Sequence, residues 1–154
     1  MKKVSTKNFK KTLSKFSTGI TVVCVKNNNS IYGKTVNSFN SLSLNPPMVL
    51  FSLGNYSSSI KKFSKTKFLS INILSSKQKK LSDNFALTEP NLEDIKFIKG
   101  KNKTVIIPNC IANLECELME KIKRGDHIIF ICKILELQSN DKLKPLVYFN
   151  SKYF

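Results

Sequence analysis

The 154-residue sequence has few of the residues that zinc centres need. It has no tryptophan and one histidine, and its four cysteines include no C-x-x-C pair. The histidine is not spaced to complete a zinc site with them, so we expect no metal centre. Cys24 and Cys132 lie inside apolar runs, where buried free thiols are expected, and a reducing cytoplasm fits such cysteines best.

Long hydrophobic runs are missing as well. No stretch approaches the roughly 20 apolar residues of a membrane-spanning helix. The basic N-terminus, MKKVSTKNFKKTLSKF, has neither a continuous apolar core nor a small-residue cleavage site. Phe9, Leu13 and Phe16 form an apolar stripe at helical spacing among lysines. A membrane-surface helix is one explanation, but three apolar residues make a narrow face, so we expect the stripe to pack onto the domain.

Acidic residues are scarce, since ten Asp and Glu oppose 26 Lys and Arg and leave a net charge of +16. Such an excess suggests nucleic acid or another polyanion as a partner. The excess is almost all lysine, however, and Asn, Ile, Phe and Ser are also abundant, so an AT-rich coding sequence explains it better. A positive field would in either case speed the arrival of anionic ligands.

The familiar nucleotide and hydrolase motifs are absent: G-x-G-x-x-G, the P-loop, G-x-S-x-G and H-E-x-x-H do not occur. A Rossmann domain, an NTPase and the common hydrolases are therefore not supported. The sequence does have 41% apolar residues. We expect one domain over residues 1–154, because a chain of this size buries about 68–70% of its unfolded surface.

Hydrophobic periodicity predicts a mainly β domain with short helices. The expected helices span about 5–15, 58–65 and 77–84, and residues 87–103 form a loop. The expected strands span about 20–25, 31–38, 48–53 and 68–74, a long hairpin over 112–122 and 127–137, and a final strand over 146–154. Because closure removes exposed edges, an antiparallel barrel is the expected architecture.

Residues 31–53, IYGKTVNSFNSLSLNPPMVLFSL, place small polar side chains between two apolar runs. Gly33 permits close approach of the backbone to a ligand. Hydrogen-bond donors follow at Thr35, Asn37, Ser38 and Ser41, and two prolines stiffen the turn before the next strand.

The order G-x-T-x-N-S-F-x-S-x-S-x-x-P-P closely resembles the flavin-binding segment of the flavin reductase-like family, whose members reduce FMN or FAD with NAD(P)H. The resemblance covers nearly the whole chain, and its other matching segments are FKKTLSKFSTGITVVCV (9–25), SLGNYSSS (52–59), FLSINIL (68–74), NFA (84–86), GDH (125–127) and the closing Leu146, Tyr148 and Tyr153. It implies the FMN-binding split barrel, an antiparallel Greek-key-type fold, usually a homodimer with flavin near the subunit interface. Split-barrel reductases bind NADH over the flavin, so the missing Rossmann motif does not exclude it.

The resemblance also implies which residues hold the flavin. The strand end at Ser52 and Leu53 and the turn at Ser57, Ser58 and Ser59 would face its phosphate side, although plain capping of a helix is the alternative for these serines.

The same likeness places Thr35, Val36, Asn37 and Ser38 along the isoalloxazine edge, where donors stabilise the reduced, anionic ring. The remaining implied flavin-binding residues are Lys34, Phe85, Ala86 and Tyr148. Lys34 departs from the apolar residue common in the family: facing the flavin it would raise the reduction potential, and facing solvent it would have no role. Ser151 replaces a common glycine, so Tyr148 and Tyr153 can equally be core aromatics.

His127 falls on the family's G-D-H position. We expect its imidazole near the nicotinamide or flavin, as the catalytic-site residue that shapes the hydride-transfer pocket. It need not act as an acid or base, because hydride transfer is the cofactors' own chemistry.

Two classes of function follow. The first is an NAD(P)H:flavin oxidoreductase that passes reduced flavin to a partner monooxygenase, with a variant that holds FMN and reduces another substrate. The second is a basic β-barrel that binds single-stranded nucleic acid. Many Phe residues lie within apolar runs and no RNP-type motif occurs, so we expect the enzyme and no specific nucleic-acid partner.

Overall fold

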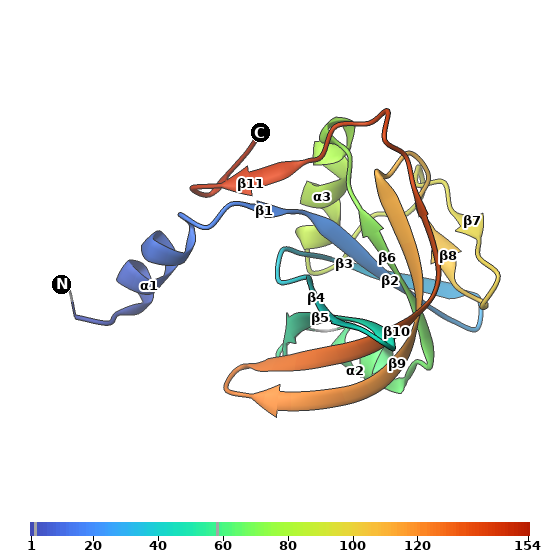
Figure 1. Ribbon diagram of the computed structural model, residues 1–154, viewed down its shortest axis with the longest axis horizontal. Coiled ribbons are helices and arrows are strands. Elements are labelled where there is room, and N and C mark those ends of the chain that lie inside the picture. The colour runs from blue at the N-terminus through green and yellow to red at the C-terminus, as the bar shows by residue number, and fades with distance from the viewer. Residues whose placement is uncertain (2, 58) are drawn as a thin grey trace.

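Seven antiparallel strands form the central sheet, in the order β3-β2-β6-β9-β10-β5-β4. The computed structural model describes residues 1, 3–57 and 59–154, and the sheet curls through its centre (Figure 1). The strands are β2 (Thr21–Asn27), β3 (Ser30–Val36), β4 (Asn40–Leu44), β5 (Pro47–Gly54), β6 (Phe68–Ile73), β9 (Ala112–Arg124) and β10 (His127–Ser139). The predicted class, mainly β with short helices, is confirmed.

Short elements surround this sheet. The helices are α1 (Thr6–Leu13), α2 (Ile60–Lys65), the 3₁₀ turn η1 (Ser76–Gln78) and α3 (Lys79–Ala86). Strands β1 (Thr18–Gly19), β11 (Val147–Phe149) and β12 (Lys152–Tyr153) form a small second sheet, and β7 (Ile98–Lys99) pairs with β8 (Val105–Ile106). The expected final strand is thus a tight hairpin, in which Asn150 and Ser151 both adopt positive φ, as the common glycine would.

The β9–β10 hairpin is the longest feature of the fold. Each strand has 13 residues, and Gly125 takes a left-handed φ of 55° in the turn that joins them. On its other side β10 pairs with β5, and the rings of Phe130 and Phe51 stack at the centre of this pairing with centroids 5.0 Å apart. The pairing therefore brings the start of β10 to the end of β5.

Strand β2 is buried on both faces, which explains its unbroken apolar sequence. Val23 and Val25 belong to the core inside the curled sheet, with Phe51 and Phe130. Val22 and Cys24 point the other way, into a second core under α3. Alternation of side chains along a strand gives this division.

The sheet does not close into a barrel, which corrects the expectation of closure. Strands β3 and β4 remain as its two edges. Where β3 ends beside β5, a side chain supplies the contact instead: Ser38 Oγ donates to the Ser52 carbonyl at 3.0 Å and accepts from the Ser52 N–H at 2.9 Å. Strand β4, which the sequence analysis missed, forms the edge beyond β5.

Helix α1 begins at the expected N-cap, Ser5, whose hydroxyl accepts from the Asn8 N–H at 3.2 Å. It projects away from the sheet (Figure 1), and none of its residues is buried. Phe9, Leu13 and Phe16 are 58%, 53% and 75% exposed, so the prediction that this stripe packs onto the domain is wrong. Across the described residues, no helix has the length and apolar character that crossing a membrane requires.

A buried carboxylate fixes the turn between β7 and β8. Glu115 accepts hydrogen bonds from the N–H groups of Lys101 (3.0 Å) and Asn102 (2.9 Å), and from the Thr104 hydroxyl (2.6 Å). Gly100 has no space for a side chain, since a Cβ there would lie 2.7 Å from Glu115 Oε2. Burial alone would raise the pKa of Glu115, but these hydrogen bonds hold it below its ordinary value of 4.5.

Glu115 should therefore make stability depend on pH. Its native-state pKa is lowered, so its contribution is present above about pH 4.5 and is lost as the pH falls through the native-state value. Glu115→Gln removes the charge and should lower the free energy of unfolding at pH 7 by about 1.5–3 kcal/mol. Between pH 5 and 3 the free energy of unfolding of this variant should fall by less than that of the wild type. Urea unfolding across this range measures both effects. Glu120→Gln, an exposed residue on the same strand, is the control, and equal behaviour of the two variants would contradict this account.

Candidate functional site

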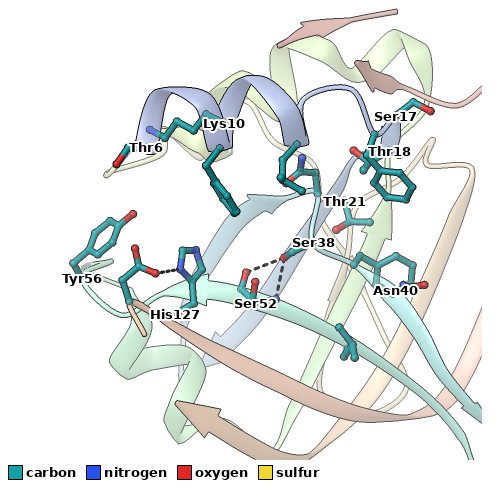
Figure 2. A pocket seen from close by; sticks show the side chains of 18 of the residues that line it. Thr6, Lys10, Ser17, Thr18, Thr21, Ser38, Asn40, Ser52, Tyr56 and His127 are labelled. Atoms are coloured by element: carbon teal, nitrogen blue, oxygen red, sulfur yellow. Dashed lines mark hydrogen bonds and ion pairs between the residues drawn. The ribbon is translucent and has the colours of Figure 1, made fainter. Parts of the chain in front are cut away.

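An open groove of about 1530 Å³ lies between α1 and the end of the central sheet (Figure 2). It exceeds the roughly 300–1,000 Å³ of a typical ligand pocket, so it has room for more than one nucleotide ring system. Four predicted site residues line it although three separate segments carry them: Asn37, Ser38, Ser52 and His127. The structure therefore brings these four positions to one groove.

Asn37 and Ser38 follow the last residue of β3 and have different roles. The hydroxyl of Ser38 is occupied by the backbone of Ser52, so it holds β3 against β5 rather than facing a ligand. The Asn37 side chain is exposed in the groove and makes no hydrogen bond with the described residues. Its amide is therefore an available donor beside a fixed backbone.

His127 opens β10 and lines the groove (Figure 2). Its Nδ1 lies 2.7 Å from Asp126 Oδ1, and its side chain is 43% exposed. The hydrogen bond and the charge of His127 lower the pKa of Asp126, which stays ionised. A carboxylate at Nδ1 favours the tautomer with the proton there, and it leaves Nε2 for a second partner.

One polar atom in the groove wall lacks a partner. Thr18 Oγ1 is buried and, within the part of the chain that the structure describes, has no hydrogen-bond partner. Buried hydroxyls are normally hydrogen-bonded, so Thr18 is an exception to this rule among the described residues. The exposed Asn37 amide is the group in this wall that could bond to the polar edge of a ligand ring.

One family model matches most of the chain. A model described as a flavin reductase like domain matches residues 13–154. The chain belongs to the flavin reductase-like family. This confirms the resemblance read from its motifs, and it places α1 mostly outside the matched region.

Individual relatives agree with the family. The chain is 33% identical over 137 residues to FMN reductase (NADH) SmoA of Agrobacterium fabrum, covering 89% of this chain and 79% of that protein. It is 28% identical over 153 residues to the reductase subunit HsaB of a flavin-dependent monooxygenase from Mycobacterium tuberculosis, covering 97% and 82%. The solved flavin reductase PheA2 matches with a TM-score of 0.91 and 33% identity over 98% of this chain and 97% of that one. Two further relatives are longer, and the chain spans 45% of each.

The predicted enzyme class, an oxidoreductase that reduces flavin with a nicotinamide nucleotide, is confirmed by these relatives. In this flavin reductase the predicted flavin-binding residues fall into two groups. Asn37, Ser38 and Ser52 line the groove, and the side chains of the others lie outside its lining. For the second group a direct role toward flavin stays a prediction.

Lys34 faces neither solvent nor the groove, which corrects both alternatives considered for it. It is 9% exposed, and its Nζ donates to the carbonyls of Leu87 (2.5 Å) and Thr88 (3.3 Å) after α3. Burial lowers the pKa of this ammonium. Thr35 is also turned toward α3, where its hydroxyl donates to the Ser82 carbonyl at 2.6 Å.

The apolar members of the prediction pack in the two cores. Val36 and Leu53 lie inside the curled sheet, and Phe85 lies in the second core, where its ring occupies the space beside Gly33. A Cβ at Gly33 would lie 2.4 Å from the Phe85 ring, so that glycine serves packing of α3 rather than approach to a ligand. Ala86 is exposed at the end of α3.

The remaining predicted residues lie at two other places. The hydroxyls of Ser57 and Ser59 pair with each other at 3.2 Å before α2, and Ser59 makes no capping bond. Ser58 lies outside the described residues. Tyr148 packs against Tyr153, whose hydroxyl is 2.9 Å from Ser82 Oγ, as expected of core aromatics with a polar end.

Sequence reasoning missed several groove residues. Thr18, Lys10 and Tyr56 line it. The quoted segments contain all three, but the sequence analysis gave none of them a functional role. Tyr56 had one available indication, since it follows a strand end and stands between Asn55 and Ser57, outside any apolar run. Among the described residues no cluster of His, Cys, Asp and Glu could hold a metal ion.

Proposed function

We propose that this chain reduces free FMN or FAD with NADH or NADPH, and that a flavin-dependent monooxygenase consumes the reduced flavin. The observation that carries the proposal is the groove, which Asn37 and the Asp126–His127 pair line. The printed names of the relatives support it, because SmoA is an FMN reductase (NADH) and HsaB is a reductase subunit of a monooxygenase.

When bound, a flavin supplies the hydride-accepting chemistry. The chain's own residues bind the flavin and the nicotinamide nucleotide and orient them relative to each other. The Asn37 amide can donate to a ring edge that gains negative charge, while Ser38 keeps the adjacent backbone in place. His127, held by Asp126, presents its second nitrogen to the nicotinamide side and limits the orientations available there. Phe9, Leu13 and Phe16, on α1 and just after it, line the other wall of the groove.

The proposed assembly is a homodimer of FMN-binding split barrels of the Greek-key type. Apolar side chains that are exposed beside the groove support it: Phe9, Leu13 and Phe16 near α1, and Leu42 and Leu44 on the edge strand β4. A specific interface would bury more than about 1,000 Å². The proposed compartment is the cytoplasm, which suits four free cysteines that are all buried.

An assay of NADH and NADPH oxidation with added FMN or FAD tests the activity. We expect flavin-dependent turnover well above the non-enzymatic rate. No turnover with any of the four combinations would contradict the proposed reaction.

His127→Ala should separate nicotinamide use from flavin binding. Loss of a positioning contact of about 1.5–3 kcal/mol would lower kcat/KM for NAD(P)H roughly ten- to a hundred-fold, with the flavin Kd nearly unchanged. Arg124→Gln, at the other end of the same turn and outside the groove lining, is the control. Stopped-flow reduction of pre-bound flavin measures the step, and unchanged kinetics in His127→Ala would return this residue to an ordinary turn position.

Light scattering tests the assembly. We expect the mass of a dimer, about twice the 17.5 kDa chain, across micromolar concentrations. A monomer that retains full activity would refute it.

A further inference from the structure

Tyr56 is the most exposed aromatic residue in the groove lining. Its side chain is 79% exposed, whereas the Phe side chains of the sheet core are fully buried. Tyr56 and His127 lie at the same end of the groove (Figure 2). Single exposed aromatics are common on surfaces, so its significance depends on how the ring is held.

The ring is held against backbone. A Cβ built on Gly54 would lie 2.9 Å from Tyr56 Cζ, 3.1 Å from Cε1 and 3.2 Å from the hydroxyl oxygen, so the ring covers the place where a side chain would stand. Gly54 is also the register partner of His127 in the β5–β10 pairing. Gly54 therefore contacts the phenol ring of Tyr56 and pairs with His127, which places both side chains beside the same point of β5.

The backbone of Tyr56 is anchored on both sides. The Ser57 N–H donates to the Gly54 carbonyl at 3.1 Å, which closes a four-residue turn with Tyr56 inside it. The Asn55 N–H donates to the Asp126 carbonyl at 2.9 Å and ties this turn to the β9–β10 turn.

We propose that the Tyr56 ring is a stacking platform for a planar heteroaromatic ring of a bound nucleotide, a binding role that rests on the proposed function. A rigid aromatic side chain supplies contact area at little loss of conformational entropy. Its electron-rich face complements the electron-poor isoalloxazine of oxidised FMN, and NADH offers the planar adenine as well as its nicotinamide. Both nucleotides could stack on this ring, and the experiment below distinguishes which of them does.

The test compares Tyr56→Ser, which removes the ring, with Tyr56→Phe, which keeps it. FMN and NADH are titrated separately by their own fluorescence, and the KM for each is measured. Tyr56→Ser should weaken one nucleotide by about tenfold or more, as loss of an aromatic–base stack does, while Tyr56→Phe stays within about twofold of wild type. A higher FMN Kd with lost quenching assigns the platform to flavin, and a higher NADH Kd and KM alone assigns it to nicotinamide.

Gly54→Ala is an independent variant, since its Cβ displaces the ring and should weaken the same nucleotide without removing the phenol. Phe154→Ser, an exposed aromatic outside the groove lining, is the matched control. Wild-type affinities in Tyr56→Ser would overturn the proposal, as would a Tyr56→Phe variant as weak as Tyr56→Ser, because the hydroxyl would then be the binding group. Wild-type protein without turnover would refute the reaction, while both fluorescence titrations would still decide the platform.

Discussion

The register of β10 between β9 and β5 is the constraint on which both the core and the groove depend. Side chains alternate between the two faces of a strand, so a slip of one residue would send every apolar side chain of β10 to the opposite face. The stacked Phe51 and Phe130 oppose such a slip from the centre of the pairing. The same register sets His127 beside Gly54, and with it the turn that carries Tyr56.

Side chains cover the β3 edge of the open sheet and bridge the gap between β3 and β5, where the sheet does not close. At the β3 edge the buried ammonium of Lys34 bonds to carbonyls that follow α3, and Phe85 fills the space beside Gly33. At the gap between β3 and β5, Ser38 bridges to the backbone of Ser52. An exposed edge strand is otherwise open to pairing with another chain. The groove occupies the side of this gap that remains accessible.

Local pattern predicted the parts of the fold whose burial follows a regular period. The long hairpin, the apolar β2 run and α3 could be located because their apolar residues alternate, run together or recur at helical spacing. Strand β4 could not, since its sequence NSLSL is almost entirely exposed and it is a strand only through its pairing with β5. Likewise β8 has two residues and depends on the Glu115 turn.

The predicted site residues that line the groove stand at or near strand ends, whereas those deeper within strands point into the cores or toward α3. Asn37, Ser52 and His127 reach the groove because the strands that carry them end or begin there. Lys34 and Thr35 lie within β3, and their partners on or after α3 are more than 40 residues away in sequence. No local pattern encodes such a contact. Helix α1 was predicted correctly, but the prediction that its apolar stripe packs onto the domain was wrong. Amphipathicity shows which face of a helix is apolar but not what covers that face.

A crystal structure of the protein with FMN tests the central claim, that the groove at the β5–β10 end is the flavin site, most directly. The account predicts isoalloxazine density in the groove, within contact of Asn37 and on the same side of the sheet as His127. Density instead in the smaller cavity of about 320 Å³ between β3 and α2, lined by Tyr32, Lys62 and Glu89, would contradict it.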